Sequence, residues 1–336
     1  MNSRLAAPVQ TIPTAVRPRK KARPRVKETT EAKGGAQENL KKRQPEKNLK
    51  DLGLPVRRLA KPVAVAKAIP QPSLIIPLPE SGQTPFATVS PTGLHRRYVA
   101  WESEVMERRM EMLIFGHAGT RVLVFPTRRG RFYEYEDGGL VEALRPRIER
   151  GELQLFCVDG IDGESVYNRS IPPQQRIMNH VQYEQHILHE VLPYSERVNV
   201  NSVLVAHGAS LGAWHAMNIA LRHPHLFQRV VSLSGRYDLT ASMPPDFHDL
   251  FDGYYDQTIY YNTPLHFLPR MSDPELLEKL QRLEITLVIG EQDPFLANNR
   301  DMGHVLANAG IRHSLHLWSG RAHRFARWRE MVPQFV

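Results

Sequence analysis

A serine lies in a Gly-x-Ser-x-Gly motif at residues 208–212, between the apolar run SVLVAH and a segment of helical character that begins at Leu211. A sharp turn between a buried strand and a helix needs small flanking residues, and it projects Ser210 above the end of the strand. The helix N-terminus behind the turn places the backbone N–H of Leu211 where a developing oxyanion can be stabilised. The pattern predicts a nucleophilic serine.

A serine hydroxyl is a weak nucleophile unless a base accepts its proton and an acid orients that base. Asp293 follows the apolar run ITLVIG, and His323 follows the run SLHLW. The chain order Ser210, Asp293, His323 is one in which catalytic triads occur. We therefore predict that these three residues form a triad. Glu291 and Asp238 are the competing candidates for the acid.

The loop after the apolar run RVLVFP is expected to supply a second oxyanion donor, from the backbone N–H of Thr127 or Arg128. Arg128, Arg129 and Arg131 also bring positive charge to the expected opening of the site. Either an anionic substrate group binds there, or the loop is simply basic and solvated. Of these arginines, Arg129 is taken as the candidate for substrate binding.

Tyr254 and Tyr255 belong to an aromatic stretch, residues 237–270, for which the sequence predicts no regular structure. The two tyrosines are candidates for one wall of an acyl or alcohol pocket, although packing against the sheet explains them equally well. Neither a metal nor an organic cofactor is required by this chemistry, and none is predicted.

The elements that position these residues alternate between short apolar runs and stretches of helical spacing. Strands are predicted at 96–102, 109–115, 121–126, 153–159, 202–207, 229–235, 285–290 and 314–318. Helices are predicted at 139–150, opened by Glu136 and Asp137, and at 172–192, 211–222, 274–282, 296–309 and 325–332. This alternation predicts an α/β fold with a mostly parallel central sheet and helices on both faces, whose site lies at the carboxyl ends of the strands.

Residues 1–92 differ from the rest of the chain in composition. They carry 18 Lys and Arg against 6 Asp and Glu, a net charge of +12, together with 13 of the 26 prolines. Such a segment buries too little apolar surface to offset the entropy of ordering, so we predict a disordered basic tail and linker before a domain at 93–336. Its charge makes contact with a polyanion plausible.

Several classes of protein are excluded by composition. The single cysteine, Cys157, rules out a disulfide framework and a cysteine-based zinc cluster. No apolar run approaches the length of a membrane span, and the N-terminus lacks the apolar stretch of a secretory signal. These features favour a cytoplasmic location, whereas the oligomeric state is left open.

The chain resembles the putative-esterase branch of the α/β-hydrolases, which is related to esterase D, S-formylglutathione hydrolases and mycolyltransferases. The resemblance covers residues 94–336 and includes VLVFPTRRGRFYEYED, GASLGAWHAMNIALRHPHLF, DGYYDQTIYYNTP and LWSGRAHRFARW. It implies an α/β-hydrolase fold with Ser210 as nucleophile, Asp293 as acid and His323 as base. Members of this branch usually have Asp and Trp where this chain has Arg324 and Phe325. An arginine beside an imidazole should disfavour its protonated form.

These observations together predict a serine hydrolase that cleaves a carboxylic ester or thioester through an acyl-enzyme intermediate. An acyltransferase would use the same residues with a different acyl acceptor. A third hypothesis is a non-catalytic scaffold of the same fold whose basic tail contacts nucleic acid or another polyanion.

Overall fold

The computed structural model describes residues 10–11, 87–89, 93–243 and 247–336. The prediction of a disordered tail and linker over residues 1–92 lies almost entirely outside the described residues. Two short strands are described within that range, Gln10–Thr11 and Ala87–Val89. The chain divides into two units, and the second, residues 14–62, lies wholly outside the described residues.

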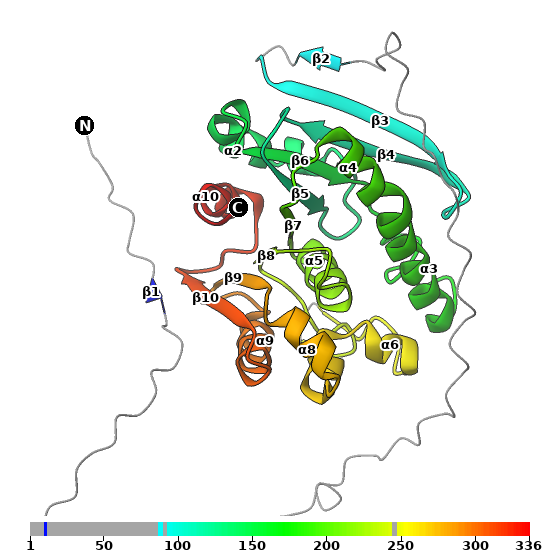
Figure 1. Cartoon of the computed structure of the whole chain (residues 1–336). Coiled ribbons are helices and arrows are strands. Elements are labelled where there is room, and N and C mark those ends of the chain that lie inside the picture. Colours follow the sequence, from blue (N-terminus) through cyan, green and yellow to red (C-terminus); the bar gives the residue numbers. More distant parts are fainter. Residues whose placement is uncertain (1–9, 12–86, 90–92, 244–246) are drawn as a thin grey trace, which may run out of the picture. The chain divides into compact units, whose positions relative to one another are not determined.

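One sheet runs through the described part of the chain (Figure 1). Its strands are β1 Gln10–Thr11, β2 Ala87–Val89, β3 His95–Ser103, β4 Arg108–Phe115, β5 Thr120–Phe125, β6 Leu153–Val158, β7 Leu204–Ala209, β8 Arg229–Leu233, β9 Glu284–Gly290 and β10 Arg312–Trp318. Their order is β1-β10-β9-β8-β7-β5-β6-β4-β3-β2. The six strands from β6 to β10 in that order are parallel, whereas β4 pairs antiparallel with both β3 and β6. The predicted mostly parallel sheet is confirmed.

Helices pack on both faces of this sheet, as predicted. They are α1 Glu134–Asp137, α2 Leu140–Glu149, α3 Pro173–His186, α4 Leu192–Val198, α5 Leu211–Arg222, α6 Gln257–Tyr261, α7 Pro264–Phe267, α8 Pro274–Leu280, α9 Leu296–Asn308 and α10 Phe325–Phe335. A π-helical turn, η2 Ile187–Val191, joins α3 to α4, and a 3₁₀ turn, η3 Leu268–Arg270, follows α7.

Side chains that alternate along the strands belong to two separate apolar cores. In β4, Met112 and Ile114 face the core covered by α3, α4, α5 and α9, whereas Leu113 and Phe115 face the core covered by α1, α2 and α10. Figure 1 shows α2 and α10 together on one side of the sheet and α3 and α5 on the other. Because strands buried on both faces read as continuous apolar runs, this layering explains the runs in the sequence.

The helix predicted over residues 172–192 is longer than expected. It continues to Val198 as α3, η2 and α4, without stopping at Pro193. The π-helical turn breaks the regular pattern of backbone hydrogen bonds just before this proline, which then lies in the first turn of α4, where a missing N–H costs nothing.

The beginning of α2 differs from the prediction. Glu136 and Asp137 do not open this helix but belong to the separate short helix α1. Gly138 is the C-cap of α1, and Gly139 is the N-cap of α2, with a φ of +74° in the left-handed region that glycine adopts readily. Glu136 pairs instead with Arg96 of β3, at 2.8 Å.

The stretch 237–270 contains α6, α7 and η3, although the sequence predicted no regular structure there. Asp256 caps α6 by accepting the backbone N–H of Ile259, and Pro264 begins α7. The capping aspartate and the proline are the sequence features that indicate where these two helices begin. Helices of four or five residues are too short to show a hydrophobic periodicity, so the sequence did not predict them.

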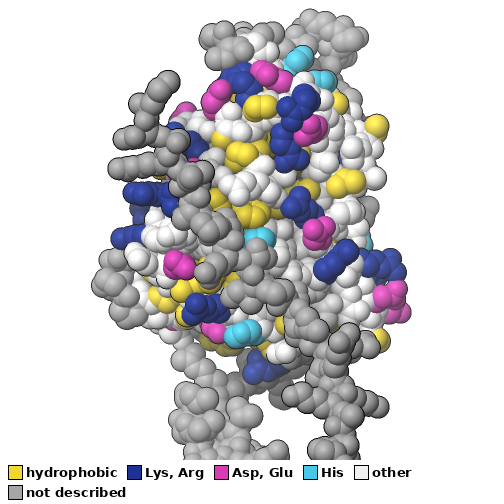
Figure 2. All heavy atoms as spheres, turned by 90° about the vertical axis from the view of Figure 1, so that its left-hand side faces the viewer, with side chains coloured by type: hydrophobic (Ala, Val, Ile, Leu, Met, Phe, Trp, Pro, Cys, Tyr) yellow, Lys and Arg dark blue, Asp and Glu magenta, His cyan; other side chains and the backbone are white. Residues whose placement is uncertain are grey.

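The face of the molecule in Figure 2 carries basic and acidic side chains close to one another, with hydrophobic side chains in small separate patches. On this face, therefore, positive charge is not concentrated in one region. Within the described part of the chain, no helix has the length and apolar character needed to cross a membrane.

Candidate active site

Ser210 stands on a strained turn between β7 and α5. Its φ of +56° and ψ of −116° are conformations that a non-glycine residue rarely adopts. A Cβ atom on Gly208 would collide with the backbone of Gly212, and one on Gly212 would collide with the carbonyl oxygen of Phe125 in β5. The two glycines are thus required because the turn, the helix and the neighbouring strand approach one another at backbone distance.

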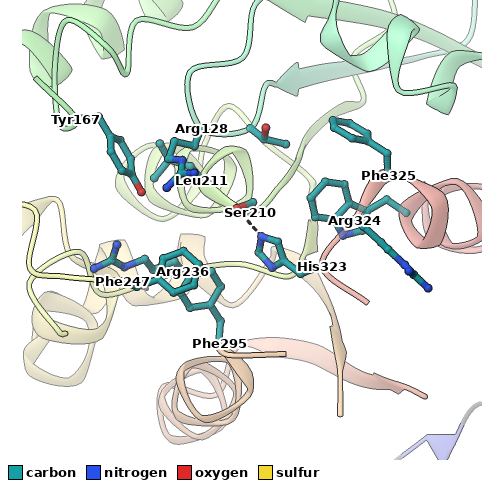
Figure 3. Close-up of a pocket in the computed structure, with 12 residues that line it drawn as sticks. Arg128, Tyr167, Ser210, Leu211, Arg236, Phe247, Phe295, His323, Arg324 and Phe325 are labelled. Atoms are coloured by element: carbon teal, nitrogen blue, oxygen red, sulfur yellow. Dashed lines mark hydrogen bonds between the residues drawn. The ribbon is translucent and has the colours of Figure 1, made fainter. Parts of the chain in front are cut away.

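Hydrogen bonds join the three residues predicted as a triad. His323 Nε2 lies 2.9 Å from Ser210 Oγ (Figure 3), and His323 Nδ1 lies 3.1 Å from Asp293 Oδ2. The carboxylate of Asp293 is buried, and its other oxygen accepts the backbone N–H of Phe295 at 3.0 Å. Because the three residues follow the carboxyl ends of β7, β9 and β10, the parallel sheet brings them together.

The competing acids lie elsewhere. Glu291 is exposed. Asp238 pairs with His266 at 3.2 Å and accepts the backbone N–H of Thr240 at 2.8 Å. Neither carboxylate is hydrogen-bonded to His323, so the geometry favours Asp293.

Aromatic rings hold the His323 imidazole in place. The rings of Phe295 and Trp328 approach it edge-on, with centroids at 5.4 and 5.3 Å. Trp328 is itself fixed by an indole N–H that donates to Ser234 Oγ at 3.2 Å. A base that is restrained on both sides keeps the orientation that proton transfer from a serine requires.

Two backbone N–H groups beside Ser210 are left without a hydrogen-bond acceptor in the described part of the chain. Those of Leu211 and Arg128 have no acceptor among the described residues, and both residues line the cavity above Ser210. Thr127 also lines this cavity, but its N–H donates to Glu134 Oε2 at 2.7 Å and its hydroxyl to Glu134 Oε1 at 2.6 Å. Of the two candidates in this loop, Arg128 therefore has the available N–H, and Thr127 anchors the loop.

The cavity above Ser210 has a volume of about 310 Å³, within the range of small-molecule sites. Its lining consists of Thr127, Arg128, Tyr167, Ser210, Leu211, Arg236, Phe247, Phe295, His323, Arg324, Phe325 and Trp328. Aromatic and basic side chains predominate, and no acidic side chain is among them. Arg324 is exposed, and in Figure 3 its guanidinium group points away from Ser210.

The three candidate substrate-binding residues do not line this cavity. Arg129 is exposed, and its backbone N–H donates to Asp162 at 3.4 Å. The Tyr254 hydroxyl donates to Asp256 at 2.9 Å, and the Tyr255 hydroxyl is hydrogen-bonded to His266 at 2.9 Å.

The residues that sequence reasoning missed are Tyr167, Arg236, Phe247, Phe295 and Trp328. Tyr167 and Arg236 come after the carboxyl ends of β6 and β8. Sites in parallel sheets lie at the carboxyl ends of the strands, so the argument that predicted Asp293 also applies to these two residues. Phe247 comes from the long connection after β8, and no pattern in the sequence indicated that it returns to the site.

Two buried histidines, one in each of the elements that flank the Ser210 turn, are held by hydrogen bonds. His207 Nδ1 donates to the carbonyl oxygen of Val231 at 2.8 Å, and Nε2 lies 2.9 Å from the Tyr135 hydroxyl. His215 Nε2 lies 3.0 Å from Asp162 Oδ1. Among the described residues, no group of three or more His, Cys, Asp and Glu side chains has an arrangement suited to a metal ion.

Comparison with known proteins identifies the family to which the chain belongs. Residues 135–335 match the family described as Putative esterase. This match spans more than half of the chain, which therefore belongs to that family of ester hydrolases, as the resemblance predicted. No curated protein matches the sequence.

Solved structures of esterases share the fold at low sequence identity. A ferulic acid esterase superposes with a TM-score of 0.57 at 15% identity, covering 72% of this chain and 95% of its own. The S-formylglutathione hydrolase FrmB from Staphylococcus aureus has a TM-score of 0.55 at 15% identity, covering 71% and 96%. The fluorophosphonate-binding serine hydrolase FphF from the same organism, solved with substrate bound, has a TM-score of 0.56 at 16% identity, covering 71% and 95%. At such identities the likeness establishes the α/β-hydrolase fold.

Proposed function

We propose that the protein is a serine esterase whose nucleophile is Ser210. His323 accepts the proton of the hydroxyl as Ser210 attacks the acyl carbonyl, and Asp293 holds the imidazole and stabilises its charged form. His323 returns this proton to the departing alcohol as the bond from the acyl carbon to the alcohol oxygen breaks, which leaves the acyl group on Ser210. His323 then takes a proton from a water molecule that attacks the acyl group, and the free acid leaves as the Ser210 hydroxyl is restored. The N–H groups of Leu211 and Arg128 stabilise the oxyanion in both steps.

The observation that carries this proposal is the continuous chain of hydrogen bonds from Ser210 Oγ through both nitrogens of His323 to Asp293. A serine in a strained turn, a base with two partners and a buried acid have no evident structural purpose in this arrangement. The scaffold hypothesis would require the same geometry to persist without chemistry, and the hydrogen-bonded triad therefore counts against it.

Labelling with a fluorophosphonate probe tests the nucleophile. We expect covalent labelling of the full chain and its loss in Ser210→Ala and in His323→Ala. Ser202→Ala and His304→Ala change exposed residues away from the triad and serve as matched controls that retain labelling. A folded protein that is not labelled, or labelling that survives in Ser210→Ala, would contradict the proposal.

Whether water or another alcohol accepts the acyl group is decided by product analysis. We propose hydrolysis, because the chain belongs to a family of ester hydrolases. Incubation of an activated ester with a series of alcohols would give free acid as the main product, whereas predominant transfer to one alcohol would indicate an acyltransferase. Contact between the basic tail and a polyanion stays a prediction, which deletion of residues 1–92 would test by loss of binding.

A further inference from the structure

Arg236 is a buried cation held by neutral groups. Only 2% of the residue is exposed, and its Nη2 donates to the carbonyl oxygens of His248 at 2.7 Å and Ala241 at 2.9 Å. Nε donates to the carbonyl oxygen of Asp238 at 3.3 Å. No carboxylate forms an ion pair with it in the described part of the chain. Since a buried charge without an ion pair is costly, an anion that reached this guanidinium group would be bound favourably.

The two nearest acids are committed to other groups. The carboxylate of Asp238 accepts the Thr240 backbone N–H and pairs with His266. The carboxylate of Asp249 accepts the backbone N–H of Phe251 at 2.7 Å. Their negative charges favour the protonated form of Arg236 and partly oppose the burial that lowers its pKa, but neither carboxylate forms an ion pair with it.

This guanidinium group lies in the wall of the cavity above Ser210. Besides the three carbonyl oxygens it is hydrogen-bonded to the Tyr167 hydroxyl, which belongs to the same wall, and none of these partners carries a charge. The carbonyl contacts at Nε and Nη2 fix the plane of the group, so the group is pre-oriented. A fixed donor loses little conformational entropy when a ligand binds.

A second cation lies beside it. The guanidinium carbon of Arg128 is 5.5 Å from the centre of the Tyr167 ring, and the positive charges of Arg236 and Arg128 partly offset the burial that raises the pKa of Tyr167. In Figure 3 the side chains of Arg128, Tyr167 and Arg236 lie together on one side of Ser210, opposite Phe325. We call these three residues the anion site.

We propose that the anion site binds a carboxylate of the substrate while Ser210 attacks the ester carbonyl of the same molecule. The substrate class is then esters that carry a free carboxylate, and the cavity of about 310 Å³ has the size of a small-molecule site. This inference rests on the proposed esterase function and adds substrate selectivity to it.

Matched pairs of esters that differ only in charge test this selectivity. On the acyl side, the monomethyl esters of glutaric and adipic acid are compared with the methyl esters of the corresponding monoamides. On the alcohol side, para-acetoxybenzoate is compared with para-acetoxybenzamide. In one of these two comparisons we expect kcat/KM for the carboxylate to exceed that for the amide by about tenfold or more, which is the effect of a charge-assisted hydrogen bond. The comparison that shows this difference tells whether the acyl part or the alcohol part of the substrate carries the carboxylate.

Substitutions then show which residues cause the preference for the carboxylate over the amide. In Arg236→Gln and Arg128→Gln, the ratio of kcat/KM for the carboxylate to that for the amide should fall by about tenfold. Arg321→Gln removes an exposed positive charge two residues from His323, outside the cavity lining, and should leave the ratio unchanged. If Arg236→Gln does not fold, the wild-type pairs and Arg128→Gln still decide the question.

The outcomes separate this inference from the proposed function. Turnover of neutral esters with no preference for the carboxylate in either comparison would overturn the anion site and leave the esterase intact. A preference that falls equally in Arg321→Gln would also overturn it, because the cause would then be the general field of the protein. Absence of both turnover and fluorophosphonate labelling would contradict the proposed function, and the inference would fall with it.

Discussion

Glu134 accepts both the backbone N–H and the hydroxyl of Thr127, at 2.7 and 2.6 Å. Burial raises the pKa of this carboxyl group, and the two hydrogen bonds from Thr127 oppose that effect. Glu134 belongs to α1, so a helix on one face of the sheet anchors the loop that carries Arg128. The loop is therefore held from behind, with the next N–H in the chain left facing the cavity.

Removing this anchor should weaken stabilisation of the oxyanion. In Glu134→Ala we expect kcat to fall by about ten- to a hundredfold, with a smaller change in KM, because a misplaced oxyanion donor affects the transition state more than the bound ester. Steady-state hydrolysis of a neutral aryl ester measures both constants.

Glu134→Gln is the matched control for this change. The amide oxygen can accept the Thr127 N–H while the amide nitrogen donates to the Thr127 hydroxyl oxygen, so most of kcat should be retained. A folded Glu134→Ala protein with the kcat of the wild type would show that the loop keeps its position without Glu134.

Asp293→Asn should separate orientation of the base from its presence. The amide cannot stabilise the charged imidazole and favours the wrong tautomer of His323, so we expect kcat to fall by about a hundred- to ten-thousandfold. The rate of fluorophosphonate labelling should fall in parallel. Glu291→Gln, which changes an exposed acid two residues away, should leave both rates within about twofold. A large loss in Glu291→Gln together with an active Asp293→Asn would reassign the acid.

His207 should make the protein sensitive to acid. Burial lowers the pKa of this histidine to about 4 from its ordinary 6.5, so the native state keeps it neutral where the unfolded chain binds a proton. The unfolded state therefore binds more protons in this window, and the free energy of unfolding should fall as the pH drops from 6.5 to 4, on the order of 3 kcal/mol in total.

Denaturant unfolding across that pH range measures the effect. In His207→Gln the slope should be smaller than in the wild type, although His180, with a pKa lowered to about 3 by burial, still contributes in the same direction. His304→Gln changes an exposed histidine and should leave the slope as it is. Equal slopes for the wild type and His207→Gln would refute the assignment.

The proximity of Ser210, Asp293 and His323 could be predicted from the sequence because each follows a recognisable apolar run, and the parallel sheet brings the ends of such runs together. Ser210 had in addition a local motif that only one kind of turn tolerates. The sheet itself was predictable for the same reason, since its strands are buried on both faces and are bounded by glycine and proline.

The walls of the site were harder to predict. Phe247 and Arg236 meet at the cavity because the chain after β8 folds back on itself, and that path depends on carbonyl contacts that leave no periodic trace in the sequence. For Tyr254 and Tyr255, aromatic character is the only sequence feature that indicates a place in the site. Both instead bind polar groups within their own connection, since a nearby partner in sequence is reached at a lower cost in loop entropy than the distant cavity.

Gly212 should tolerate no side chain, although it lies in a helix where alanine is ordinarily the better residue. A Cβ atom there would collide with the carbonyl oxygens of Phe125 and Pro126, which are backbone atoms and cannot rotate away. Gly212→Ala must therefore push α5 away from β5 and the adjoining loop, which carries the Arg128 N–H. We expect a loss of about 1–3 kcal/mol in the free energy of unfolding and a fall in kcat for any ester.

Gly303→Ala in α9 is the same chemical change without the collision. Its new Cβ atom would meet nothing closer than His313 Nε2 at 3.8 Å, so this variant should gain about 0.5–1 kcal/mol from helix propensity and keep its kcat. Thermal unfolding and ester turnover of the two variants, measured side by side, test the comparison. If Gly212→Ala were as stable and as active as Gly303→Ala, the close approach of α5 to β5 could not be what restricts the turn, and the requirement for glycine after Ser210 would need another cause.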